Sequence, residues 1–79
     1  MITIKLKYPI EFAGRKITEL KMRRAKAADF HSAQKQHKAD EDRELAIFAN
    51  LTENEPEALK QLDMADYKQL QTALEGFLS

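Results

Sequence analysis

The two side chains best suited to proton transfer or metal binding are His31 and His37, which lie six residues apart in a segment of helical composition. Six residues span about 600° of helical rotation, so the two imidazoles point to different sides of a helix. The chain has no cysteine, and neither histidine belongs to an HExxH pattern. We therefore predict that both histidines are surface or boundary residues and that the chain has no metal ligands.

An acidic run, Asp40-Glu41-Asp42 followed by Glu44, is the next candidate for a cation site. The run lacks the alternating oxygen ligands, the interior glycine and the closing glutamate of a calcium loop. Acidic residues in the first turn of a helix complement the positive end of its dipole. The acidic run therefore predicts the start of a helix.

Residues that would supply a nucleophile or hold a phosphate are sparse. Ser32 and Ser79 are the only serines, and neither lies in the glycine-flanked turn that presents a nucleophile. The only glycines, Gly14 and Gly76, are too isolated to form a phosphate-binding loop. We predict that the protein is not an enzyme and that it has no catalytic residue and no cofactor.

A basic run, Lys21, Arg23, Arg24 and Lys26, is the best candidate for a nucleic-acid site. It supports an alternative function, a small nucleic-acid-binding regulator that uses this junction between strand and helix. No aromatic side chains interleave with these cations for base stacking, however, and the second half of the chain is acidic. Two consecutive helices predicted within residues 56–77 invite comparison with a helix-turn-helix, but the final one complements phosphate poorly. Nucleic acid is thus an unfavoured partner.

The chain is short enough to form one domain, residues 1–79, with a thin hydrophobic core. Residues 2–7 and 15–22 alternate apolar and polar side chains, which predicts an antiparallel β-hairpin over residues 2–22. The spacing of apolar residues turns helical over residues 26–78. The predicted fold class is α+β, an N-terminal β-hairpin followed by a small bundle of three to four helices.

The register of the hairpin depends on its turn, which we place at Ala13-Gly14. If the strands paired without interruption from this turn, their apolar side chains would lie on opposite faces of the sheet. A slip of one residue near Tyr8-Pro9 would place Leu6 opposite Leu20 and restore a common apolar face. Because proline cannot donate to the ladder, we predict a bulge there.

Four helices are expected after the hairpin, and capping signals mark two of their starts. Asp40 and Asp63 are predicted N-caps. Leu62 and Tyr67 have the spacing of a hydrophobic staple around the second of these. Pro56 suits the first turn of a short helix. The predicted helices are residues 26–38, 41–51, 56–61 and 64–78.

Charge is distributed unevenly along the chain although the net charge is zero. Residues 1–38 hold ten Lys and Arg against three Asp and Glu, and residues 39–79 hold three against ten. The halves, at +7 and −7, either neutralise each other on folding or form a basic and an acidic face through which copies associate head to tail. A second copy of the chain is therefore one expected partner, and the result would be a homo-oligomer.

Several short motifs follow one another along the chain: Pro9-Ile10-Glu11-Phe12 with Gly14, Thr18-Glu19-Leu20 with Arg23 and Arg24, Asp29, Leu51-Thr52, Pro56-Glu57 with Leu59, and Leu62-Asp63 with Asp66-Tyr67 and Leu70. Their order resembles that in the Mu-like phage tail assembly chaperone family, the small tail assembly proteins of long-tailed phages and prophages. The resemblance spans nearly the whole chain, and it departs at Ala25-Lys26, where a Pro-Thr-like helix start is expected.

The resemblance implies a chaperone that binds the long, largely helical tape measure protein and keeps it soluble before tail tube polymerisation. Exposed apolar stripes on such a helix would aggregate, and apolar grooves on many small domains would shield them. The apolar helix faces supply the expected partner-binding residues, since no family motif fixes the contact surface. These are Leu45, Phe48, Leu51, Tyr67, Leu70, Leu74, Phe77 and Leu78.

The same resemblance implies a second, longer product made by a −1 ribosomal frameshift, for which codons of Gly76-Phe77-Leu78 would supply the slippery sequence. That frameshifted form of the chain is then a further partner.

The N-terminus lacks the apolar middle of a signal peptide, and no apolar run approaches the roughly 20 residues that span a bilayer. These features predict that the chain stays in the cytoplasm and has no membrane partner. The resemblance implies that this is the cytoplasm of the bacterial host and that the chain is absent from the mature virion. A third possible function is that of a structural subunit of the virion.

Overall fold

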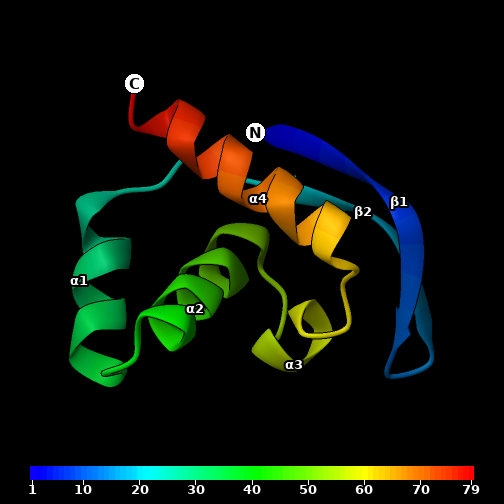
Figure 1. Ribbon diagram of the computed structural model, residues 1–79, viewed down its shortest axis with the longest axis horizontal. Coiled ribbons are helices and arrows are strands. Elements are labelled where there is room, and N and C mark those ends of the chain that lie inside the picture. Colours follow the sequence, from blue (N-terminus) through cyan, green and yellow to red (C-terminus); the bar gives the residue numbers. More distant parts are fainter.

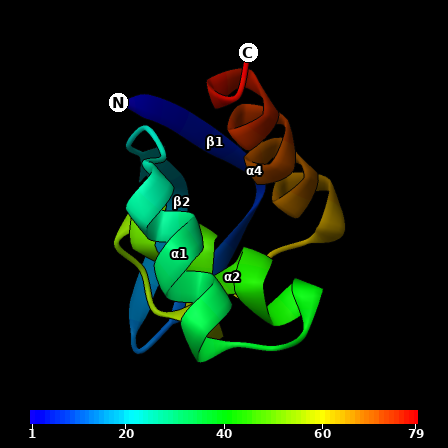
Figure 2. The same cartoon turned by 90° about the vertical axis from the view of Figure 1, so that its left-hand side faces the viewer.

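The computed structural model describes residues 1–79, in which a two-stranded antiparallel sheet is followed by four helices. This confirms the predicted α+β fold. Figure 1 shows the last helix crossing above the hairpin and the second helix, with both termini at the same end of the molecule. Figure 2 shows the first helix lying against the second, on the side away from the hairpin. The elements are β1 (Ile2–Phe12), β2 (Arg15–Met22), α1 (Ala27–Gln36), α2 (Asp40–Thr52), α3 (Pro56–Leu59) and α4 (Met64–Phe77).

The hairpin turns at Ala13-Gly14, as the sequence predicts. Both residues have positive φ, 52° at Ala13 and 77° at Gly14. Positive φ at both central residues is characteristic of the type I′ turn, whose twist matches that of the flanking strands. Glycine adopts this conformation freely, whereas Ala13 adopts it at some cost because its Cβ crowds the backbone.

The strand register agrees with the prediction near the turn and departs from it further along. Ile10 pairs with Ile17, but Ile4 and not Leu6 lies opposite Leu20, so the predicted pairing of Leu6 with Leu20 is wrong. The irregularity falls between Lys5 and Ile10, which includes the predicted position, but it shifts the register by three residues instead of one. An odd shift still restores one common apolar face.

The apolar face of the sheet forms one side of the core. Ile4, Leu6, Leu20 and Met22 are buried from the hairpin, while polar residues alternate with them toward solvent. The helices contribute the opposing side chains, of which the largest that are completely buried are Phe48, Leu51, Leu59 and Leu70. The alternation read from the sequence therefore identifies the buried face of both strands.

The helix ends follow the capping chemistry at Asp63 but not at Asp40. Asp63 is the N-cap of α4, and its Oδ1 accepts the N–H of Ala65 at 2.8 Å. At α2 the prediction is wrong, because the N-cap is Ala39 and Asp40 is the first helical residue. The Asp40 carboxylate instead accepts the guanidinium of Arg43 at 2.9 Å. Arg43 also donates to a main-chain carbonyl at the end of α1, which fixes the connection between the two helices.

Candidate functional site

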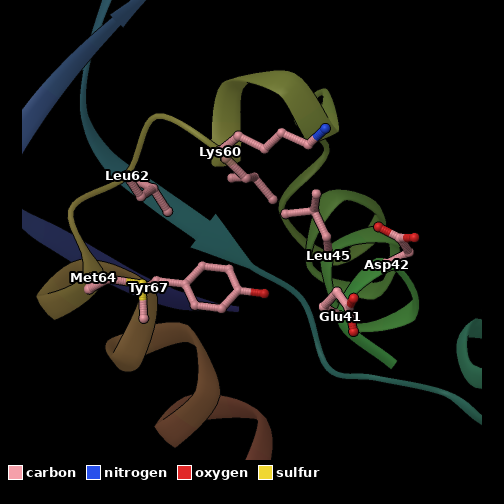
Figure 3. Close-up of a pocket in the computed structure, with 8 residues that line it drawn as sticks. Glu41, Asp42, Leu45, Lys60, Leu62, Met64 and Tyr67 are labelled. Atoms are coloured by element: carbon pink, nitrogen blue, oxygen red, sulfur yellow. The ribbon is translucent and has the colours of Figure 1, made fainter. Parts of the chain in front are cut away.

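A hollow lined mainly by hydrophobic residues lies in the surface where the first turns of α2 and α4 meet α3. It is a cavity of about 340 Å³. Figure 3 shows Leu45, Leu62 and Tyr67 directed toward one another from three segments of the chain, with Glu41 and Asp42 on the α2 side. We call this hollow the α2–α4 pocket, lined by Glu41, Asp42, Leu45, Leu59, Lys60, Leu62, Met64 and Tyr67.

Helix α2 provides one wall because only part of its apolar surface reaches the core. Phe48 and Leu51 point inward and are almost completely buried. Leu45, one turn before Phe48, is only half-buried and contributes to the pocket. The opposite wall begins with Leu62 and Tyr67, which flank the N-cap Asp63 at the spacing of a hydrophobic staple.

Tyr67 is held in place at this wall by packing and by hydrogen bonds. Its ring meets Phe48 edge to face, with 5.4 Å between centroids. Its hydroxyl donates to Glu44 Oε1 at 2.8 Å, and Gln71 donates to the same oxygen at 3.1 Å. Burial raises the pKa of Tyr67 above the ordinary tyrosine value, and the hydrogen bond to Glu44 raises it further. The phenol is therefore a neutral, fixed part of the wall.

The rim of the pocket is acidic. Glu41 and Asp42 are exposed in the first turn of α2, and their side chains make no ion pair or hydrogen bond. Lys60, the only cation at the rim, is paired with Glu57 at 3.0 Å. The two unpaired carboxylates complement the dipole of α2 and also give the opening of the pocket a net negative charge.

A second, smaller hollow of about 190 Å³ adjoins this pocket. Asp42, Leu45 and Lys60 line both hollows, so the two lie on either side of these residues. The second hollow continues between α2 and α3 toward His37 at the end of α1. Together the hollows form a groove, which we call the α2–α3 groove.

The structure separates the eight residues expected to bind a partner. Leu45 and Tyr67 lie together in the α2–α4 pocket. Phe48, Leu51 and Leu70 are buried in the core and offer no surface to a partner. The remaining three lie elsewhere: Leu74 lines a hollow between α1, α2 and α4, Phe77 packs beneath Arg24, and Leu78 is exposed at the C-terminus.

Three apolar residues of the pocket were missed by the helix-face argument. Leu59 and Leu62 belong to the short α3 and the turn after it, where helical periodicity is too brief to assign a face. Met64 lies in the first turn of α4, and 72% of its surface is exposed. The staple spacing around Asp63 is the one sequence signal that points to this wall.

Two residues of the basic run predicted as an alternative nucleic-acid site, Arg23 and Arg24, make contacts within the chain. Arg23 makes a two-pronged pair with the buried Asp29 at 2.7 and 3.1 Å, which lowers the pKa of that carboxyl. Arg24 lies over the ring of Phe77 at 5.1 Å from its centroid. Lys21 and Lys26 are exposed. Two of the four cations therefore have structural partners within the chain.

No group of three or more His, Cys, Asp or Glu side chains is placed to hold a metal ion. None of the helices combines the length and the apolar character needed to cross a membrane.

Residues 3–79 match the family model described as "Phage tail assembly chaperone proteins, E, or 41 or 14". The match covers nearly the whole chain, from β1 to the residues after α4. No curated protein and no solved structure matches the chain.

Proposed function

This chain belongs to the phage tail assembly chaperone family, and we propose that it binds the tape measure protein and keeps it soluble until the tail tube polymerises around it. The family match over residues 3–79 is the observation that carries the proposal. The family also supports a role without catalysis.

The surface of the chain is compatible with reversible shielding of a long helix. The α2–α4 pocket offers apolar walls that the chain's own residues do not fill. A long helix with exposed apolar stripes aggregates unless those stripes are covered, and a small domain with an apolar groove covers a short stretch of one. Many copies would be needed along the length of one tape measure protein.

Co-expression tests this proposal directly. The tape measure protein of the same phage or prophage is produced in bacteria under three conditions: by itself, together with this chain, or together with an unrelated small folded domain. We expect it in the pellet in the first and third cases and in the supernatant in the second, where it should also co-purify with this chain. A tape measure protein that stays insoluble in all three cases contradicts the proposal.

We further propose that the chain acts in the host cytoplasm and leaves the complex before the virion is complete. A coat around the tape measure protein occupies the space that the tail tube must take, so assembly of the tube displaces it. Mass spectrometry of purified particles should detect the tail tube protein and not this chain. Recovery of the chain in particles at a fixed ratio to tube subunits would instead indicate a virion subunit.

A longer frameshifted form is part of the same proposal. Codons GGT TTT TTG for Gly76-Phe77-Leu78 would contain the heptamer T TTT TTG, on which a ribosome slips back by one nucleotide. A gene that uses synonymous codons without a slippery heptamer at this position would exclude a frameshift there.

A further inference from the structure

The α2–α3 groove combines an apolar floor with an acidic rim. The floor is formed by Leu45, Leu62 and Tyr67 over the buried Leu59, and Met64 beside it is largely exposed. Methionine side chains are flexible and polarisable, so an exposed one at a groove adapts to different apolar partners. The floor has no converging polar groups of the kind that orient a small-molecule ligand.

The charge of the rim determines which charge is favourable on a bound partner. Glu41 and Asp42 are exposed and unpaired, while Lys60 is neutralised by Glu57 at 3.0 Å. Removing an unpaired carboxylate from water without a counterion is unfavourable, and bringing a second anion to it is repulsive. The groove therefore opposes phosphates and acidic segments, and it favours an apolar segment that also brings a cation.

The elements that line the groove decide the backbone conformation of the occupant. Its walls come from helices, from the turn after α3 and from His37 just after α1, and no strand edge is among them. An extended segment would leave its backbone N–H and C=O groups unpaired, because the groove has no strand edge. A helix pairs these groups internally and presents only side chains to the groove. The hollows on either side of Leu45 can each receive an apolar side chain from one face of such a helix.

We propose that the α2–α3 groove binds an amphipathic helix of the tape measure protein, with large apolar side chains on the floor and Lys or Arg opposite Glu41 and Asp42. This inference rests on the proposed function and specifies which segments of the tape measure protein the chain covers. Those segments are helical stretches in which Lys or Arg flanks the apolar stripe, and stretches flanked by Glu or Asp are left for other contacts.

Two synthetic peptides test the charge preference with the full chain. Both are fluorescein-labelled helices of the same length with an identical Leu and Phe stripe, and the positions flanking the stripe are Lys in one and Glu in the other. Fluorescence anisotropy should show roughly tenfold tighter binding of the Lys peptide at low salt, and a smaller difference at high salt. Equal binding of the two peptides at low salt overturns the proposal.

Matched variants locate the preference on the molecule. The double substitution E41K/D42K should reverse the order of the two peptides, and E41Q/D42N should abolish the preference with less disturbance of the α2 dipole. E11K/E75K makes the same charge change outside the groove and should leave the preference intact. Circular dichroism verifies that each variant is folded. If the folded E41Q/D42N protein keeps the full preference, the rim is not the cause and the proposal fails.

The apolar part has its own pair of variants. Leu45→Ala should weaken binding of both peptides several-fold, since it removes part of the floor. Leu74→Ala is the control, because Leu74 is also half-buried but lines a separate hollow. Equal weakening by the two substitutions would place the binding site elsewhere and contradict the proposal.

The tape measure co-expression assay separates this inference from the function on which it rests. If the wild-type chain and the E41K/D42K chain keep the tape measure protein soluble equally well, the proposal about the groove is overturned. The proposed function is not affected by that result. A wild-type chain that fails in that assay overturns the function, whereas the peptides still test the groove. If neither peptide binds and E41K/D42K abolishes association between copies of the chain, the occupant is a second copy and the proposal is overturned.

Discussion

The carboxylate of Asp66 accepts the backbone N–H of Lys7 at 2.9 Å and so joins the first turn of α4 to a strand 59 residues earlier. Its other oxygen accepts the N–H of Tyr8 at 3.0 Å. Gln69 donates both to Asp66 and to the carbonyl of Lys5. Residues 6–9 bulge out of the ladder with β2, and Asp66 supplies the acceptor that the amides of Lys7 and Tyr8 would otherwise lack. The three-residue register shift is thus stabilised from α4.

Replacing Asp66 with Ala should lower the free energy of unfolding by about 2–4 kcal/mol. The side chain is completely buried, and its loss leaves two backbone N–H groups without their acceptor. Asp66→Asn should cost less, since one oxygen can still accept. Urea denaturation measures both, with Asp63→Asn as the control because Asn caps a helix about as well as Asp. Equal effects of the Asp66 and Asp63 substitutions would show that the bulge does not need its acceptor.

Stability should fall as the pH drops below the usual aspartate pKa of 3.8. Burial alone would raise the pKa of Asp66, but the N–H groups of Lys7 and Tyr8 bind its charged form and hold the pKa below that value. The pairing with Arg23 lowers the pKa of Asp29 in the same direction. The unfolded chain therefore takes up protons at a higher pH than the folded one, so acid favours unfolding.

Urea midpoints measured from pH 6 downward check this pH dependence. Asp66→Asn removes one of the two groups with a lowered pKa, so the midpoint should decline less steeply with acid than in the wild-type chain. A slope unchanged by this substitution would assign the acid sensitivity to other carboxylates.

Tyr67→Phe should cost about 0.5–1.5 kcal/mol through loss of the hydrogen bond to Glu44. Tyr8→Phe removes the exposed tyrosine and should change stability by less than about 0.5 kcal/mol. The Tyr8→Phe variant leaves Tyr67 as the only tyrosine, so its ultraviolet absorbance reports the ionisation of Tyr67. That signal should rise only above pH 10, the ordinary tyrosine value. A rise below pH 10 would mean that the phenol is not buried against Glu44.

The hairpin turn predicts two substitutions of opposite sign. Ala13→Asn should stabilise the protein by about 0.5–1 kcal/mol, because Asn-Gly is the preferred pair for a type I′ turn. Gly14→Ala should destabilise it by about 1 kcal/mol through backbone strain alone, since nothing lies within 4 Å of the added Cβ. Thermal unfolding of both variants measures the effects. Stabilisation by Gly14→Ala would contradict the assigned turn.

Local patterns in the sequence were enough to predict most of the fold. Alternation identified the hairpin and its buried face, Gly14 located the turn, and the capping signal at Asp63 placed the start of α4. The size of the register shift was not predictable, because the side chain that stabilises it is Asp66, a residue of the last helix. A carboxylate in the first turn of a helix has an ordinary local explanation, and nothing near it in sequence indicates a strand as its partner.

The candidate site was predictable only in part, for a related reason. Helical spacing selects apolar residues but does not say which face is covered, so it grouped the buried Phe48 with the half-buried Leu45. The pocket arises where three helices meet, and two of its walls come from segments too short to show periodicity. The acidic rim was visible in the sequence, but as a helix start and not as part of a groove.

The dependence of the bulge on Asp66 bears on how the chain folds as the ribosome releases it. The hairpin emerges before α4, and at that stage water must solvate the amides of Lys7 and Tyr8. A lone two-stranded hairpin is marginally stable at best, and this one has a gap in its ladder until the last helix arrives. The hairpin is therefore expected to remain unstable in the nascent chain until α4 has been synthesised, and to become stable together with that helix.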